Sequence, residues 1–297
     1  MRQNRKGMSL SQISEQIKDL YQVELSEEQI SNITDSVMEE VTNWQVRPLD
    51  YTYPIVYLDG IYVNIMENKT VIKKVVYVAL GVNLSGNKEL LGLWISPTEG
   101  AKFWLNVLTE LNNRGVKQVC VFCVDGLTGF PDAINAIYPT ALVQQCIVHA
   151  VRRSLNYVNH KDKKQFAALL KTVYGAKTIT EAELALDELE LAWNDKYPAA
   201  IKLWRDKWQY LANFFQFPQE IRKAIYTTNA IESVNASIRK IIKNKKSFPN
   251  DMAAFKMLYL ALRDCSRKWT MPIHDWQSAL NQFIIRFDLD LAEISKA

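Results

Sequence analysis

The chain has little glycine, little proline, few cysteines and almost no net charge. Glycine accounts for 10 of the 297 residues and proline for 9, both below the usual share in globular proteins, which favours helices. The four cysteines are too few for the disulfide framework of a small secreted domain. The formal net charge of +4 is too small to identify a partner, so the distribution of charge has to be considered instead.

The sequence also lacks a long hydrophobic run. The best candidate, Val71 to Leu84, contains Lys73 and Lys74, whereas a membrane-spanning helix needs roughly 18 apolar residues in succession. No secretory signal peptide is visible, so we expect a soluble, cytoplasmic protein. Hydrophobic residues make up 48% and charged residues 23%, which excludes a disordered or collagen-like chain.

Residues 1–47 are predicted to form a helical, helix-turn-helix-like segment. Ser9 is followed by Gln12, and Ser26 by Gln29, and a hydroxyl three residues before Gln is typical of a helix start. In a helix-turn-helix the second helix enters a DNA groove. A helical hairpin that packs on the rest of the chain is at least as well supported by this pattern.

The rest of the chain is predicted to be α/β, with a large all-helical insertion. Residues 48–150 contain three strand patterns at hairpin spacing, followed by helix, strand, helix and strand. This is the order of a ribonuclease-H-like mixed sheet, of which 48–150 would be the first part. Residues 151–221 carry no strand signal, and residues 222–297 are predicted to complete the domain with helices.

Two aspartates occupy unusual positions in the predicted strands. Asp59 shares a face with apolar residues in the most hydrophobic strand, where an ionised carboxylate needs a compensating partner. Asp125 ends another strand, the position at which ligands bind in open α/β sheets. Each also has a structural interpretation: Asp59 caps a bend at Gly60, and Asp125 starts an Asp-Gly turn. If the strands are neighbours, the two carboxylates repel unless a divalent cation lies between them, and oxygen ligands favour Mg²⁺ or Mn²⁺.

Glu232 is a third candidate, on a helix that begins after Asn229. The simpler interpretation is a capping box, in which the Glu232 side chain bonds the backbone. Helical periodicity, however, places Glu232 on one polar face with Asn235, Arg239 and Lys243. A carboxylate followed by cations along one face suits a metal site with a nucleic-acid backbone across it.

Basic residues are concentrated around this helix. Residues 222–246 hold seven basic residues and one acidic residue, a net charge of +6. Such a run offers phosphate contacts that weaken with salt, although charge runs are most often solvated faces. The candidate DNA-binding residues are Arg152, Arg153, Arg239, Lys240, Lys243, Lys245 and Lys246.

Two cysteine patterns have different interpretations. Cys120 and Cys123 lie in one predicted strand, where their thiols point to opposite faces, so we expect two core residues rather than a metal or redox pair. Cys146 and His149 lie where a strand meets a helix. A structural zinc would need two further ligands, so a bracing or substrate-facing role near Asp125 is the better hypothesis.

Five segments occur in a fixed order along the chain: YPIVYLD at 53–59, GLWI at 92–95 with EGAKFW at 99–104, VDGL at 124–127 with GFP at 129–131, QCIVH at 145–149, and YTTNAIES at 226–233. In this combination the chain resembles the mutator-type transposases of bacterial insertion sequences, and the resemblance covers essentially its whole length. It implies a ribonuclease-H-like catalytic domain of the DDE type, with a helical insertion before the glutamate-bearing helix.

The resemblance implies that Asp59, Asp125 and Glu232 are both the catalytic triad and the ligands of two Mg²⁺ or Mn²⁺ ions. Supporting residues are then Cys146, His149, Asn229 and Asn235. The implied activity is DNA strand cleavage at the element's terminal inverted repeats and strand transfer to target DNA. The resemblance also implies that the protein acts on DNA as a homodimer or larger assembly and has no membrane partner.

One departure from the family's pattern concerns the N-terminus. Family members usually carry a further N-terminal region of DNA-binding helices, and this chain begins inside what would be its last helix-turn-helix. The alternative hypothesis is therefore a truncated, non-cleaving DNA-binding derivative that regulates or inhibits the full-length transposase. A third possibility is a general ribonuclease-H-like nuclease, which would cut DNA without the element's ends and join no strands.

Overall fold

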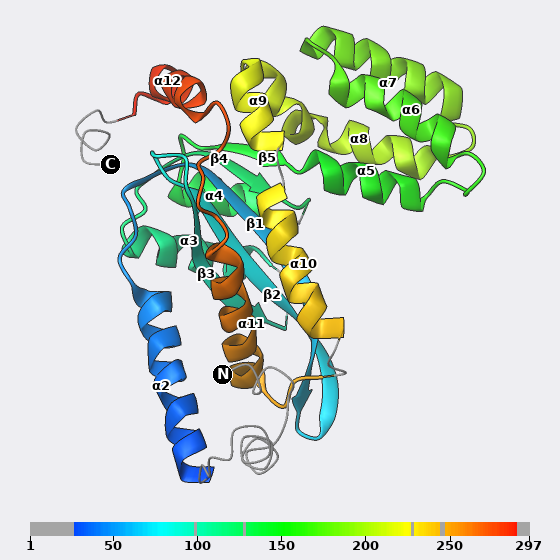
Figure 1. The fold of residues 1–297 in the computed structure, drawn as a ribbon. Coiled ribbons are helices and arrows are strands. Elements are labelled where there is room, and N and C mark those ends of the chain that lie inside the picture. The colour runs from blue at the N-terminus through cyan, green and yellow to red at the C-terminus, as the bar shows by residue number, and fades with distance from the viewer. Residues whose placement is uncertain (1–26, 98–99, 127–128, 227–228, 244–246, 290–297) are drawn as a thin grey trace.

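The computed structural model of the chain describes residues 27–97, 100–126, 129–226, 229–243 and 247–289. Its centre is a mixed sheet of five strands in the order β3-β2-β1-β4-β5 (Figure 1). The strands are β1 (Thr52–Glu67), β2 (Thr70–Val82), β3 (Lys88–Ser96), β4 (Gln118–Val124) and β5 (Leu142–Gln145). The first three pair antiparallel, whereas β1, β4 and β5 pair parallel. The predicted mixed α/β class is therefore confirmed.

The long hairpin of β1 and β2 provides the middle of the sheet. Two residues, Asn68 and Lys69, connect the strands with φ angles of 49° and 64°, the conformation that a two-residue hairpin turn requires. The first part of β1 is buried on both faces, while its distal half alternates between buried and exposed residues. A central strand covered on both sides is nearly continuously apolar, which explains why β1 could be predicted from its sequence.

Helices cover both faces of the sheet. On one face, α3 (Ala101–Asn113) and α4 (Phe130–Ile137) pack around the fully buried Trp104. On the other face lie α10 (Asn229–Lys243) and α11 (Asp251–Ser266), with α9 (Gln219–Tyr226) and α12 (Trp276–Phe287) at one end of the sheet (Figure 1). The apolar side chains of β1 divide between these two layers, so each face of the strand contributes to its own core.

The helix α2 (Glu27–Val46) packs against α11. Val37 and Val41 of α2 contact Tyr259 and Leu260, and the carboxylate of Glu40 accepts a hydrogen bond from the Tyr259 hydroxyl. The second helix predicted in residues 1–47 is thus present, and its C-terminal half packs on the body of the protein. The first predicted helix and the turn lie outside the described residues.

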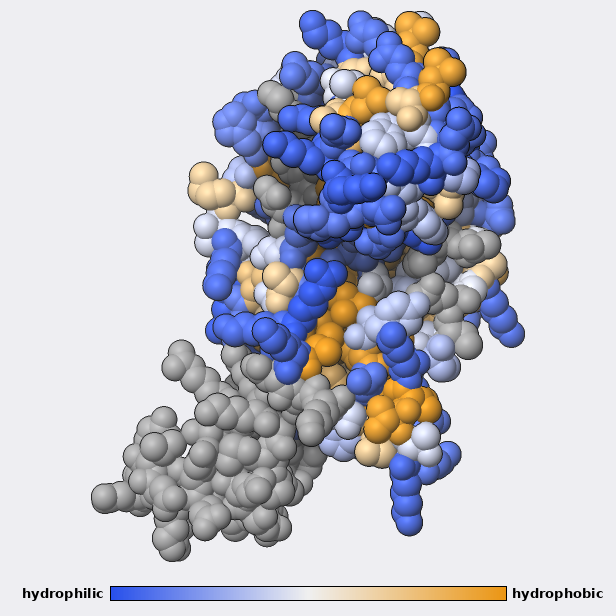
Figure 2. All heavy atoms as spheres, turned by 90° about the vertical axis from the view of Figure 1, so that its right-hand side faces the viewer, coloured by the Kyte–Doolittle hydropathy of each residue, from blue (hydrophilic) through white to orange (hydrophobic). Residues whose placement is uncertain are grey.

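The helical stretch after β5 forms an extension to one side of the sheet (Figure 1). It consists of α5 (Ile147–Asn156), α6 (Lys163–Gly175), α7 (Ile179–Trp193), α8 (Pro198–Leu211) and the 3₁₀ helix η2 (Ala212–Gln216). Trp204 is 1% exposed and its indole N–H donates to the Ser154 hydroxyl, 2.8 Å away, which ties α8 to α5. Figure 2 shows this side of the molecule, where hydrophilic side chains cover most of the upper half. None of the helices in the described ranges combines the length and apolarity needed to span a membrane.

Candidate metal centre

Two aspartates meet at one edge of the parallel part of the sheet. Strands β1 and β4 pair in parallel as far as Leu58 and Val124. Asp59 directly follows Leu58, and Asp125 directly follows Val124. In parallel strands, paired residues lie side by side at the fixed distance between neighbouring strands. The register of the sheet therefore brings the two carboxylates together although they are far apart in the sequence.

The Asp59 carboxylate is buried, with 5% of the residue exposed. Its Oδ1 accepts a hydrogen bond from the Gly60 backbone N–H at 2.8 Å, and its Oδ2 accepts one from Asn235 Nδ2 at 2.5 Å. Burial raises the pKa of Asp59, and the nearby Asp125 raises it further, whereas His149 and the Asn235 hydrogen bond act in the opposite direction. The site holds a carboxylate that a bound cation would stabilise in its charged form.

The Asp125 carboxylate is more accessible, with 26% of its side chain exposed. Its Oδ1 accepts a hydrogen bond from the Gly126 backbone N–H at 2.7 Å. Both aspartates border a pocket whose wall also includes the end of β5 and the start of α5, with apolar side chains from η2, α9 and α10. One carboxylate is thus fixed inside the protein, and the other faces the opening.

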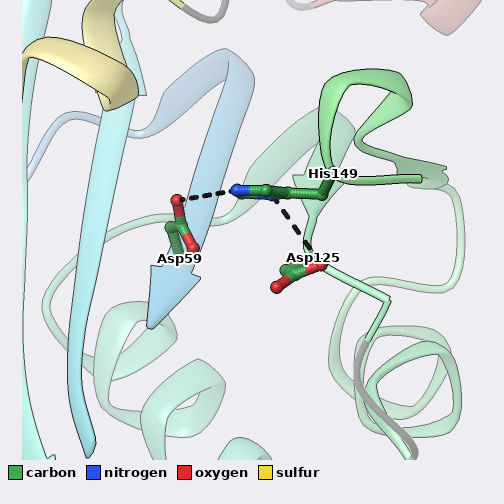
Figure 3. A group of neighbouring side chains, drawn as sticks. All are labelled: Asp59, Asp125 and His149. Atoms are coloured by element: carbon green, nitrogen blue, oxygen red, sulfur yellow. Dashed lines mark ion pairs between the residues drawn. The ribbon is translucent and has the colours of Figure 1, made fainter. Parts of the chain in front are cut away.

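His149, in the first turn of α5, lies between the two carboxylates (Figure 3). Its Nε2 is 4.0 Å from Asp59 Oδ2, and its Nδ1 is 3.7 Å from Asp125 Oδ1. A hydrogen bond with Cys146 is the main cause that raises the pKa of His149 to about 9, and the two aspartates add to it against the effect of burial. At neutral pH the imidazole is therefore protonated, and its charge offsets those of the carboxylates.

The two carboxylates, and the imidazole once it has lost its proton, form a group that could hold a metal ion. One ligand atom from each of Asp59, Asp125 and His149 lies within 4.8 Å of the others. Two carboxylates supply the oxygen ligands that Mg²⁺ and Mn²⁺ prefer. Cys146 and His149 were predicted to lie near Asp125, and in the structure His149 faces both aspartates.

Asn235 differs from its predicted environment. Periodicity assigned it to the polar face of its helix, but it is 4% exposed and its amide points to Asp59. The reason is that α10 packs on β1 through Ile231, Val234 and Ile238, and Asn235 lies at the edge of that apolar stripe. Asn235 was predicted as a supporting residue on that polar face, and the structure buries it against Asp59. The side chain of Asn229 lies outside the described residues.

Glu232 lies one turn before Asn235 on the same helix, but its carboxylate is not part of the group around His149. Instead, Glu232 Oε1 accepts a hydrogen bond from Arg152 Nη2 at 2.8 Å. The side chains of Glu232 and Arg152 are 37% and 54% exposed. The third predicted ligand therefore lies at the rim of the site, held by an ion pair between α10 and α5.

The predicted DNA-binding residues do not share one environment. Arg153, Arg239, Lys240 and Lys243 are exposed, while Arg152 is paired with Glu232. Lys245 and Lys246 lie outside the part of the chain that the structure describes. The basic run around α10 thus includes a stretch of exposed cations on its C-terminal half.

Arg222, at the start of that run, has a structural role. Its guanidinium donates hydrogen bonds to the backbone carbonyls of Phe217, Phe215 and Lys177, at 2.6, 2.6 and 2.8 Å. These bonds join the end of the helical extension to α9. The net charge of the sequence run therefore overstates the charge available at the surface.

Two residues near Asp125 were not among the predicted site residues. Lys207 of α8 donates a hydrogen bond from its Nζ to the Gly126 carbonyl at 2.7 Å, and Gln145 ends β5 at the wall of the pocket. Lys207 is 81 residues from Gly126 in the chain, and its helix shows no pattern that points to the sheet. No signal in the sequence could have identified it.

Comparison with known proteins reveals clear relatives. The family model of Mutator-family transposases matches residues 1–272. The transposase for insertion sequence element ISRM3 of Rhizobium meliloti is 44% identical over 283 residues, which cover 95% of this chain and 71% of that protein. A probable transposase for an insertion sequence element of Corynebacterium diphtheriae is 43% identical over 257 residues, 86% of this chain and 75% of its own length.

Proposed function

This chain belongs to the Mutator family of transposases, and from that premise we propose that it catalyses metal-dependent cleavage of DNA at the ends of an insertion sequence and transfer of the freed 3′-hydroxyl to target DNA. The observation that carries the proposal is the pair of carboxylates, Asp59 and Asp125, at the same edge of two parallel strands. Acidic side chains that hold divalent ions beside a phosphodiester are the usual means of cutting DNA without a protein nucleophile.

The fold we propose is ribonuclease-H-like. It would consist of residues 48–150 and 222–297 as the catalytic domain, residues 151–221 as an insertion, and residues 1–47 as an N-terminal helical segment. Support comes from the strand order, with three antiparallel strands followed by two parallel ones, and from the position of α10 across β1. In this arrangement one aspartate lies on the central strand and the other follows its parallel neighbour.

The donor set fits a divalent ion. Asp59, Asp125 and Glu232 would hold two Mg²⁺ or Mn²⁺ ions, and the buried Asp59 carboxylate, whose pKa is raised by its burial, would gain a compensating charge. When bound, such ions lower the pKa of the attacking water or 3′-hydroxyl and stabilise the charge on the leaving oxygen.

The side chains around the carboxylates orient them. Asn235 and the Gly60 N–H fix both oxygens of Asp59, and the Gly126 N–H fixes one oxygen of Asp125. Arg152 holds Glu232 in an ion pair, and Glu232 would exchange this partner for the metal site to act with the two aspartates. The protonated His149 balances the carboxylate charges before a cation binds.

The two cysteines of β4, Cys120 and Cys123, are unsuited to act as nucleophiles. Burial raises the pKa of the Cys120 and Cys123 thiols well above their ordinary value, so both remain protonated and unreactive at neutral pH. This supports water or a 3′-hydroxyl as the attacking group. Cys146 instead hydrogen-bonds His149.

DNA is the proposed partner, as terminal inverted repeats and as target. Arg239, Lys240 and Lys243 along the exposed part of α10 would contact its phosphates. Two element ends have to be brought together for transposition, so we propose that the protein acts as a homodimer or larger assembly on DNA.

Cleavage of a supercoiled plasmid that carries the element's ends tests the proposal. We expect the parent chain to nick it with Mg²⁺ or Mn²⁺, and Asp59→Asn, Asp125→Asn and Glu232→Gln each to lose that activity while they still bind DNA. Asp132→Asn is the matched control, because Asp132 is an exposed carboxylate on α4 close to Asp125 in the sequence.

Two other outcomes would assign a different function. A parent chain that binds the ends but never cuts them would identify a non-cleaving regulator. Equal cutting of a plasmid without the ends, and no joined product, would identify a general nuclease. Full activity in any of the three triad variants would remove that residue from the proposed site.

A further inference from the structure

Three hydrogen-bond donors converge beside Asp125, at Gly126. A Cβ atom placed on Gly126 would lie 2.7 Å from Lys207 Nζ, 3.4 Å from Arg153 Nη1 and 3.6 Å from Gln145 Nε2. The donors come from α8, α5 and the end of β5, so three separate elements direct them to one point. The absence of a side chain at Gly126 keeps this space open.

Two of these donors are cations without an acidic partner. In the described part of the chain, neither Lys207 nor Arg153 forms an ion pair with a carboxylate; the Lys207 ammonium donates only to the Gly126 carbonyl. Burial and the charge of Arg153 lower the pKa of Lys207, while the charges of Asp125 and Asp206 act in the opposite direction without reversing the shift. Holding two like charges together costs free energy unless an anion binds between them.

The other two cations of α8 are paired. On α8, Lys202 forms an ion pair with Asp206 at 2.7 Å, and Arg205 pairs with Glu190 of α7 at 2.6 Å. Acidic residues are thus plentiful on these helices, yet Lys207 turns towards the sheet. Among the three cations of α8, Lys207 is therefore the one that forms no ion pair with a carboxylate of the described residues.

We propose that Lys207, Arg153 and Gln145 bind a backbone phosphate of the DNA, adjacent to the phosphodiester that is cut at Asp59 and Asp125. This inference rests on the proposed function. It makes the helical insertion, through α8, a part of the cleavage site. A phosphate held by two cations and an amide N–H group receives the short, charge-assisted hydrogen bonds that fix position as well as affinity.

The position of this site explains what it contributes. Gly126 directly follows Asp125, and its N–H orients that carboxylate, while its carbonyl accepts the Lys207 bond. A phosphate bound there lies one residue away from the acidic group. The DNA strand is therefore aligned with the carboxylates by contacts to its backbone, independently of base sequence.

Replacement of Lys207 tests the inference by a measurement that needs no cleavage. The affinity of the chain for a short labelled DNA duplex is measured in metal-free buffer over a range of salt concentrations. We expect Lys207→Gln to bind roughly tenfold more weakly at low salt, with a salt dependence reduced by about one phosphate contact. Lys207→Arg, which keeps the charge, should restore most of the affinity.

Lys202→Gln is the matched control, since it removes the same charge from the same helix at a residue whose side chain is 72% exposed and paired within α8. It should bind DNA as the parent does. Arg153→Gln, at an exposed residue, should match Lys207→Gln. An affinity and salt dependence in Lys207→Gln equal to those of the control would overturn the inference and leave the proposed function intact. A parent chain that binds no DNA at all would overturn both.

Discussion

The two halves of the proposed site, Asp59 with Asp125 on the strands and Glu232 on a helix, are positioned by different means. Asp59 and Asp125 follow the last paired residues of two parallel strands, so backbone hydrogen bonds of the sheet determine their separation. Glu232 stands on α10, whose position depends on side-chain packing against β1 and on an ion pair with Arg152. In the structure the strand half, Asp59 and Asp125, is already brought together, whereas the helix half, Glu232, is paired with Arg152.

This difference indicates the order in which the site forms. Sheet register is strongly specified, because a slip of one residue would move every side chain to the opposite face. A half-exposed carboxylate at the end of a flexible side chain can instead change partner at little cost. In the proposed site the aspartates are therefore already placed to hold a cation, whereas Glu232 would have to exchange Arg152 for the metal.

The largest expected effect is a difference in metal affinity between a variant of the strand half and a variant of the helix half. Asp59→Asn should weaken Mn²⁺ binding roughly a hundredfold or more, because it removes a proposed metal ligand and not merely a supporting group. Glu232→Gln should retain an affinity within a few fold of the parent in the absence of DNA. Titration calorimetry of both variants measures this contrast, and equal losses in both would show that the halves act as one unit.

A smaller effect on activity is expected from Asn235, whose hydrogen bond to Asp59 connects α10 with β1. Asn235→Ala removes the amide that donates to Asp59, and loss of such a supporting hydrogen bond typically lowers activity roughly tenfold. Because this bond lowers the pKa of Asp59, its loss raises that pKa, and the acid limb of the cleavage profile should move to higher pH. The pH profile of plasmid nicking is the measurement.

The control for Asn235 lies on the same helix. Ser237→Ala removes a hydroxyl that bonds only the Ser233 carbonyl one turn earlier, so its pH profile should match the parent's. If Asn235→Ala lowers activity without any movement of the acid limb, the amide supports packing and does not tune Asp59.

The smallest expected effect concerns the stability of the metal-free protein. The pKa of His149 is raised to about 9 by its bond with Cys146 and by the two aspartates, above the ordinary value near 6.5. The folded state thus binds this proton more tightly, and the resulting stabilisation is full below about pH 6.5 and disappears as the pH rises through 9.

Denaturant unfolding at several pH values measures that linkage. The free energy of unfolding of the parent should fall between about pH 6.5 and 9, and His149→Gln should flatten this dependence. An identical slope in the variant would mean that His149 carries no proton between the two carboxylates.

Sequence analysis anticipated the strand half better than the helix half. Asp59 was conspicuous because a charged residue interrupts an otherwise apolar strand, and Asp125 because it ends one. Periodicity also assigned the buried stripe of α10, but it could not show that Asn235 lies within reach of β1, since that depends on how two distant segments pack. Lys207 could not be predicted for the same reason, because its contact with Gly126 depends on how α8 packs beside the end of β4.

The most direct test of the central claim is to locate the metal. Crystals of the protein grown with Mn²⁺ would reveal the ion by its anomalous scattering. We expect a peak that bridges the carboxylates of Asp59 and Asp125, and a second one beside Glu232 once DNA is bound. Ordered crystals that bind Mn²⁺ elsewhere, with no peak between the two aspartates, would contradict the account.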